Sequence, residues 1–180
     1  FDKKNPESST SWCPYKIFNV GNSKSVRLIE FITTLENEEQ LKNIEKLIKY
    51  PPIGKRSYGV NRAQVYGFEN KDYFNSWNES SIIVGQIENT KGIENLDNML
   101  SMNILDGVMI GPYDLAGSMG YPGEVNHKDV ILECKKIINI CNKHQVSVGT
   151  QVSDVSKNSI NQLFDMNYTY CILGSDLFLM

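Results

Sequence analysis

Hydrophobic and polar positions in the second half of the chain follow two alternating periods. Short apolar runs of strand type occupy residues 81–87, 105–110, 146–152 and 168–173. Between these runs, apolar residues recur at helical spacing over residues 89–102, 130–142 and 156–166. Strands that alternate with helices of ten or more residues are typical of βαβ units. The pattern therefore predicts an α/β fold with a parallel sheet.

The first part of the chain follows a less regular pattern. Residues 1–14 are polar and contain prolines, which is typical of a loop. We expect a strand over 15–20 and a helix over 25–35 that Ser25 caps. A second helix is expected to begin at Asn37-Glu38-Glu39 and to end before Pro51-Pro52, because proline removes a helical hydrogen bond.

The length and the net charge limit the classes of function that this chain could have. The 180 residues suffice for one domain with a core. A net charge of −3 gives no basic footprint for nucleic acid or an anionic membrane. The sequence contains no apolar stretch near the ~20 residues of a membrane span and no apolar segment of secretory type at its start, so we expect a cytoplasmic protein.

The four cysteines do not have the spacing of a zinc site. Cys134 and Cys141 lie seven positions apart in an apolar helical pattern, so they share one helix face. We expect both to be buried free thiols.

Candidate active-site residues lie where two predicted strands end. Gln86 and Glu88 are two positions apart and point the same way, and Asp114 follows the next strand. Active groups of parallel β/α proteins lie at the carboxyl ends of strands. Two carboxylates meeting there would suit a hard or borderline divalent ion such as Mg²⁺ or Mn²⁺.

Each of these residues has a simpler interpretation. Glu88 would also be favourable beside the positive end of the helix that follows it. Asp114 would also serve as the N-cap of a turn at Leu115-Ala116-Gly117. The small-residue segment 111–120 is either a plain tight turn or a loop whose free backbone N–H groups hold a carboxylate.

Several segments together resemble a known family. These are QIEN (86–89), DGVMIGPYDLAGSMGYPG (106–123) and NHKDV (126–130), with KYPPIGKRS (49–57) upstream and LGSD (173–176) downstream. In this order and spacing they resemble the HpcH/HpaI aldolase/citrate lyase family, and within it the 2-oxo-3-deoxy acid aldolases. The resemblance covers residues 37–180. It implies a partial TIM (β/α) barrel, roughly the last four to five β/α units.

The resemblance also implies a reaction and a site. The family's metal-dependent (class II) aldolases cleave a 2-oxo-3-deoxy acid to pyruvate and an aldehyde. By resemblance Glu88 and Asp114 are metal ligands for Mg²⁺ or Mn²⁺, and Gln86, Tyr113 and Asp114 bind the substrate. The small 2-oxo acid would be the partner, with no nucleic acid and no membrane, and the intact family implies a homo-oligomer.

Part of the family's machinery is not found in this sequence. The first strands of the family barrel bring a histidine for the acid–base step and an arginine that stabilises the enolate. His127 and His144 are expected at the surface, and Arg56 and Arg62 belong to a different family segment. We therefore expect an incomplete catalyst. The alternative is a catalytically dead remnant that keeps the pyruvate and metal pocket.

Residues 1–36 carry a second, shorter resemblance. The segment YKIFNVGNS (15–23) and the helix pattern after it are similar to the C-terminal tail of nucleotide-sugar epimerases of the UDP-glucuronate type. The Gly-rich dinucleotide loop and the Tyr-x-x-x-Lys pair of that family are absent from the sequence. The expected division is an epimerase-tail-like segment, 1–36, which does not complete the barrel, and a barrel segment, 37–180. A sugar-nucleotide epimerase fusion remains a third hypothesis.

Overall fold

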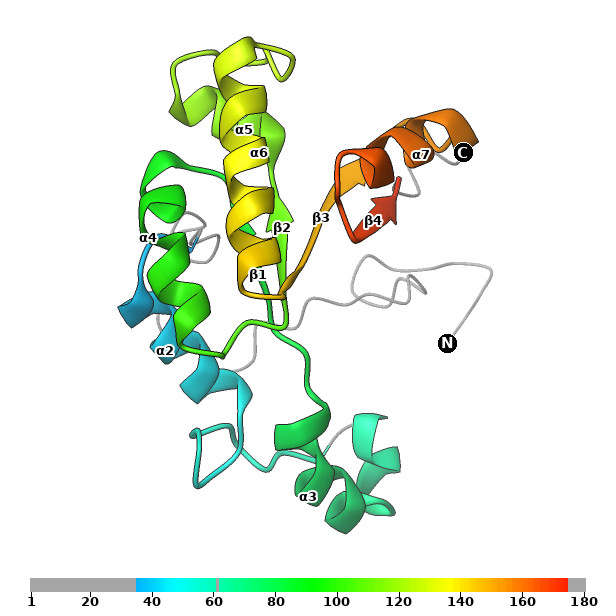
Figure 1. Cartoon of the computed structure of the whole chain (residues 1–180). Helices are drawn as coiled ribbons and strands as arrows, with labels where there is room; N and C mark the ends of the chain where they lie inside the picture. The colour runs from blue at the N-terminus through cyan, green and yellow to red at the C-terminus, as the bar shows by residue number, and fades with distance from the viewer. Residues whose placement is uncertain (1–34, 61, 175–180) are drawn as a thin grey trace, which may run out of the picture. The chain divides into compact units, whose positions relative to one another are not determined.

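The computed structural model describes residues 35–60 and 62–174 (Figure 1). Within them, four strands form one sheet in the order β1-β2-β3-β4, and every neighbouring pair is parallel. The strands are β1 (Val84–Ile87), β2 (Gly107–Ile110), β3 (Ser147–Val152) and β4 (Tyr170–Leu173). Sequential parallel order with a helix in each connection is the arrangement of a barrel wall. The α/β fold with a parallel sheet, expected as part of a TIM barrel, is confirmed.

Three of the four helices that connect these strands begin at a residue whose side chain accepts a hydrogen bond from a free N–H group. The helices are α4 (Thr90–Ser101), α5 (Pro112–Ser118), α6 (Lys128–Lys143) and α7 (Lys157–Asp165). Asn89 caps α4 by accepting a hydrogen bond from the Gly92 N–H, and Ser156 caps α7 in the same way. Helices α4, α6 and α7 thus begin within about two residues of their expected positions, whereas α5 lies in the segment 111–120 that was expected as a turn or loop.

From residue 35 onward, two helices and a 3₁₀ segment precede the sheet. Helix α2 (Glu38–Ile48) begins at Asn37, as expected, and is followed by η1 (Arg62–Gly67) and α3 (Asn70–Ser80). The sequence pattern did not predict α3, because most of its residues are polar and none is buried. An aromatic cluster secures this helix: Phe74 and Trp77 contact the Tyr50 ring edge-on.

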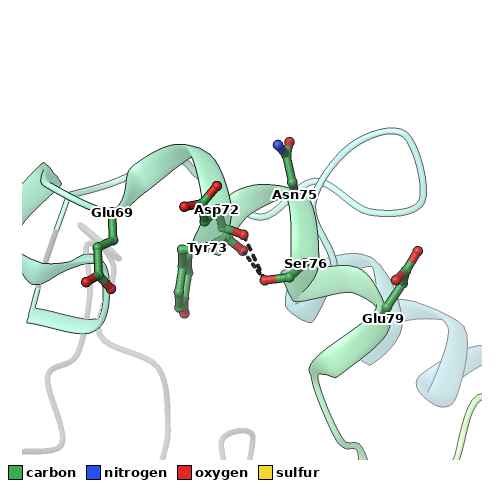
Figure 2. Close-up of a pocket in the computed structure, with 6 residues that line it drawn as sticks. All are labelled: Glu69, Asp72, Tyr73, Asn75, Ser76 and Glu79. Atoms are coloured by element: carbon green, nitrogen blue, oxygen red, sulfur yellow. Dashed lines mark hydrogen bonds between the residues drawn. The ribbon is translucent and has the colours of Figure 1, made fainter.

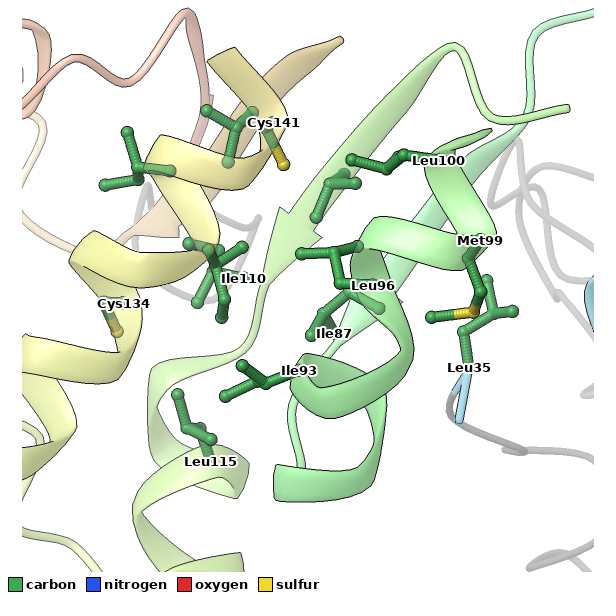
Figure 3. Close-up of a cluster of buried hydrophobic side chains, with 14 of the residues drawn as sticks. Leu35, Ile87, Ile93, Leu96, Met99, Leu100, Ile110, Leu115, Cys134 and Cys141 are labelled. Carbon is green, nitrogen blue, oxygen red and sulfur yellow. The ribbon is translucent and has the colours of Figure 1, made fainter. Parts of the chain in front are cut away.

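The hydrophobic core lies between one face of the sheet and helices α4 and α6 (Figure 3). Ile87 and Ile110 reach it from the strands, and Leu96 reaches it from α4. Cys134 and Cys141 reach it from α6, and both are buried free thiols, as expected. Because these strand positions point toward the helices, the residues between them point to the opposite face.

Some expectations fall outside the described residues. The strand over 15–20, nearly all of the helix over 25–35, the epimerase-like segment and Cys13 belong to this group. Among the residues that are described, no helix is long and apolar enough to cross a membrane.

Candidate functional site

The ends of strands β1 and β2 lie side by side at the carboxyl edge of the sheet. Ile87 ends β1 and lies beside Ile110, which ends β2, so the two strands finish at the same level. Glu88 follows the first strand directly. Asp114 lies in the first turn of α5, which begins after Gly111. Because of this strand register, the two carboxylates, Glu88 and Asp114, lie close together.

Glu88 is buried and is held by its neighbours. The Gln86 side-chain amide donates a hydrogen bond to the Glu88 carboxylate, as expected for residues two apart on one strand face. Burial raises the pKa of Glu88, and the negative charge of Asp114 and a hydrogen bond between the two carboxyl groups raise it further. The Gln86 hydrogen bond lowers that pKa in part. The structure thus brings Gln86, Glu88 and Asp114 together.

Gly111 leaves the space in which this cluster fits. A Cβ atom at this position would lie 2.7 Å from Glu88 Oε2, 3.0 Å from Glu88 Cβ and 3.2 Å from Gln86 Nε2. Any side chain there would collide with the buried carboxylate. The sequence analysis placed Gly111 in a segment that is either a tight turn or an anion-binding loop, and did not predict its closeness to Glu88.

The simpler interpretation of Asp114 as an N-cap is wrong. Gly111 occupies the N-cap of α5, and Asp114 lies inside the helix, three residues later. Asn89 caps the helix after β1, and Glu88 directly precedes that cap. Tyr113 is 67% exposed and Asp114 is also exposed, so both stand at the open side of the site.

The donor set limits which ion the site can hold. Glu88 and Asp114 offer oxygen atoms only, and Gln86 is engaged by Glu88. Throughout residues 35–60 and 62–174, no group of three or more His, Cys, Asp or Glu side chains could hold a metal ion. Two carboxylates fit Mg²⁺, which is usually bound by one or two carboxylates with waters and substrate oxygens. The Cys and His ligands of the usual zinc sites do not take part in this pair.

Both histidines of the chain have other partners. His127 is the N-cap of α6, where its Nδ1 accepts from the Asp129 N–H, and its ring stacks on Tyr121 at 3.8 Å. His144 Nε2 lies 2.9 Å from the Asp97 carboxylate of α4. These contacts assign the histidines to helix capping and to helix pairing.

The arginines of the upstream segment also lie in structural positions. The Arg56 guanidinium stands 4.1 Å from the Trp77 ring centre and 5.2 Å from that of Tyr50, within cation–π distance. Arg62 is exposed at the start of η1.

A hollow away from this carboxylate pair lies along helix α3 (Figure 2). It is lined by residues of α3 and the position before it: Glu69, Asp72, Tyr73, Asn75, Ser76 and Glu79. The Ser76 hydroxyl donates to the main-chain oxygen of Asp72, so the hollow is a surface of one helix. Its acidic residues come from a single element, in contrast to the two-strand cluster at the sheet edge.

Fold and site together define a class of protein. A parallel β/α sheet with two carboxylates at the ends of neighbouring strands is the framework of a barrel enzyme whose active site lies at the strands' carboxyl edge. The comparison with known families gives the particular group: the chain belongs to the HpcH/HpaI aldolase/citrate lyase family, whose model matches residues 30–180.

Relatives agree with this membership. A 5-keto-4-deoxy-D-glucarate aldolase of Escherichia coli O139:H28 is 33% identical over 151 residues, which are 83% of this chain and 57% of the relative. An HpcH/HpaI family protein of Burkholderia cenocepacia has the same fold, with a TM-score of 0.74 and 23% identity over 81% of this chain and 57% of that one.

A second solved structure extends the comparison. An HpcH/HpaI aldolase of Desulfitobacterium hafniense matches with a TM-score of 0.68 and 22% identity, covering 80% of this chain and 56% of that one. The chain thus spans a little over half the length of the relatives it matches.

Proposed function

We propose that Glu88 and Asp114 bind Mg²⁺ or Mn²⁺, and that the site takes up the pyruvate unit of a 2-oxo-3-deoxy acid for carbon–carbon cleavage. The observation that carries this proposal is the buried Glu88 carboxylate beside Asp114 at the carboxyl edge of the sheet. The family membership and the aldolase relative support the lyase class.

Charge balance argues for a cation. Two neighbouring carboxylates repel each other, and an acid substrate would add a third negative charge. A divalent cation neutralises this charge, so the same site then accepts an anion. A bound cation would supply Lewis-acid polarisation of the 2-oxo group.

The chain's own residues would prepare the site. Gln86 fixes the orientation of the Glu88 carboxylate by its hydrogen bond, and Gly111 leaves the space for it. The N–H groups of Tyr113 and Asp114 lie in the first turn of α5, where no side chain caps the helix. These amides would receive the substrate carboxylate, since such groups favour an anion.

Cleavage also needs an acid–base group for the 4-hydroxyl proton. General acid–base help typically contributes about 10²–10⁴-fold to the rate. Both histidines of this chain are engaged elsewhere, so we propose that the chain alone binds without efficient turnover. A catalytically dead remnant would also show little activity, so an activity assay does not test the site. Metal binding tests it directly.

The test is a Mn²⁺ titration followed by electron paramagnetic resonance of the free ion. We expect one site in the parent, and binding at least tenfold weaker in Glu88→Gln and in Asp114→Asn. Both substitutions keep the side-chain shape. Glu79→Gln, in the acidic hollow of α3, is the matched control and should bind as the parent does.

A second titration tests the substrate class. Pyruvate should tighten Mn²⁺ binding in the parent, because the two ligands share one site. Equal Mn²⁺ binding in the parent, Glu88→Gln and Asp114→Asn would refute the metal site. Binding of Mn²⁺ without any effect of pyruvate would refute the assigned substrate class.

A further inference from the structure

One layer of side chains lies level with the candidate site. Ile87 pairs with Ile110, Ile110 pairs with Thr150, and all three residues are buried. Because side chains alternate along a strand, the residue that follows each of them points to the opposite face of the sheet, here called the inner face. These following residues are Glu88, Gly111 and Gln151.

Contacts at the site agree with this order. Gln86 lies two residues before Glu88 and donates to its carboxylate, so the two side chains share the inner face. A Cβ atom at Gly111 would meet both of them. Gln151 continues the layer on β3, where its side chain is exposed. Neighbouring strands lie about 4.8 Å apart, so Gln151 is roughly 10 Å from Glu88 across the sheet.

The layer has polar side chains on either side of a glycine. A ligand held by Glu88 and Asp114 would extend over Gly111, because glycine permits a close approach to the backbone. In this direction, a carbon chain longer than pyruvate reaches toward Gln151. On the next strand, Ile172 pairs with Gln151 and is apolar, so Gln151 supplies the hydrogen-bonding group at this end of β3 and β4.

The Gln151 amide is held in place by the chain itself. Its Nε2 donates to the Gly174 main-chain oxygen, which is 3.3 Å away and follows β4. With its nitrogen engaged there, the amide offers its oxygen as an acceptor, and hydroxyl groups are donors of matching strength. The amide is also neutral, so it adds no charge that would repel an acid.

We propose that Gln151 binds a hydroxyl group on the part of the substrate beyond the pyruvate unit, and so selects hydroxylated 2-oxo acids over alkyl ones. This inference rests on the proposed function, because the metal site would hold the other end of the ligand. A substrate hydroxyl donates to the Gln151 amide oxygen. An alkyl chain covers that oxygen without satisfying it, which lowers the affinity.

The test compares two five-carbon acids that differ in one hydroxyl group, 4-hydroxy-2-oxopentanoate and 2-oxopentanoate. Binding of each acid to the Mn²⁺-loaded chain is followed by the relaxation of water protons at the bound ion. A net hydrogen bond corresponds to an affinity ratio of about two- to tenfold, so the parent should bind the hydroxylated acid more tightly by that factor. In Gln151→Met, which keeps the length of the side chain, the two affinities should be equal. Gln162→Met, on an exposed position of α7, is the matched control and should keep the parent's ratio.

The outcomes separate this inference from the metal site. Equal affinities of the two acids in the parent, or a ratio that Gln151→Met leaves unchanged, would overturn the inference and leave Gln151 only its bond to Gly174. Loss of 2-oxopentanoate binding in Gln151→Met would show that Gln151 supports the whole site, which also overturns its assignment to the hydroxyl group. A parent that binds no Mn²⁺ refutes the proposed metal site, and the inference falls with it.

Discussion

Replacing Gly111 with alanine is expected to disturb the candidate metal site without unfolding the chain. Gly111 has a φ of −100°, so alanine needs no left-handed backbone there. The added Cβ would stand 2.7 Å from Glu88 Oε2, whereas ordinary contact begins at 3.4 Å. The carboxylate must then retreat by about 0.7 Å, more than the ~0.5 Å that functional geometry tolerates.

The size of the effect follows from this displacement. Disturbing the groups that orient a metal ligand typically weakens metal binding by about 10–100-fold. Overpacking by one methyl group costs about 1–3 kcal/mol of stability, which corresponds to a fall in Tm of roughly 2–12 °C for a chain of this size. We therefore expect Gly111→Ala to stay folded and to bind Mn²⁺ at least tenfold more weakly.

The control is Gly117→Ala in the same helix. A Cβ atom at Gly117 meets nothing within 4 Å, and alanine favours a helix by up to ~1 kcal/mol. Stability should therefore stay equal or rise, and Mn²⁺ affinity should not change. The reasoning is refuted if Gly111→Ala, verified as folded by circular dichroism, binds Mn²⁺ as tightly as Gly117→Ala.

Two further predictions concern stability. Lys49 Nζ donates to Asn78 O, Ser81 O and Ser81 Oγ. In a urea titration, Lys49→Met should therefore lower the free energy of unfolding by about 2 kcal/mol. The control Lys46→Met replaces an exposed lysine and should change this free energy by less than about 0.5 kcal/mol. Burial raises the pKa of Cys134 from its ordinary 9.0 to about 11. Because the thiol then ionises more readily in the unfolded chain, the free energy of unfolding should keep its full value below pH 9 and fall by up to ~3 kcal/mol as the pH rises toward 11. Unfolding titrations of the parent and Cys134→Ala across this pH range should show a shallower loss in the variant, and parallel curves would contradict the prediction.

The regular half of the fold was predictable because two local signals coincide there. At Asn89 and Ser156 the capping residue stands immediately before an apolar helical period, and the helix begins there. Helix α3 lacks both signals, since no side-chain hydrogen bond caps it and none of its residues is buried. Contacts of Phe74 and Trp77 with Tyr50 help to hold it, and these contacts join residues more than twenty positions apart, which no local pattern encodes.

The candidate site was predictable in composition but not in shape. Glu88 and Asp114 were identified from their places after strands, and parallel register explains why these places coincide. The closeness of Gly111 to Glu88 depends on the twist and spacing of two strands, which the sequence does not state. The same is true of His127, whose role as the N-cap of α6 became clear only from its contact with the Asp129 N–H.

The surroundings of Glu88 differ from those of a carboxylate that stabilises a fold. A carboxylate kept for stability normally gains a cation or several N–H donors, which lower its pKa. Glu88 instead has a raised pKa, because burial and the charge of Asp114 outweigh the one hydrogen bond from Gln86. At neutral pH the ionised group therefore lowers the stability of the fold rather than adding to it. Local rules are broken mainly where function requires it, and a bound cation would reverse the sign of this interaction.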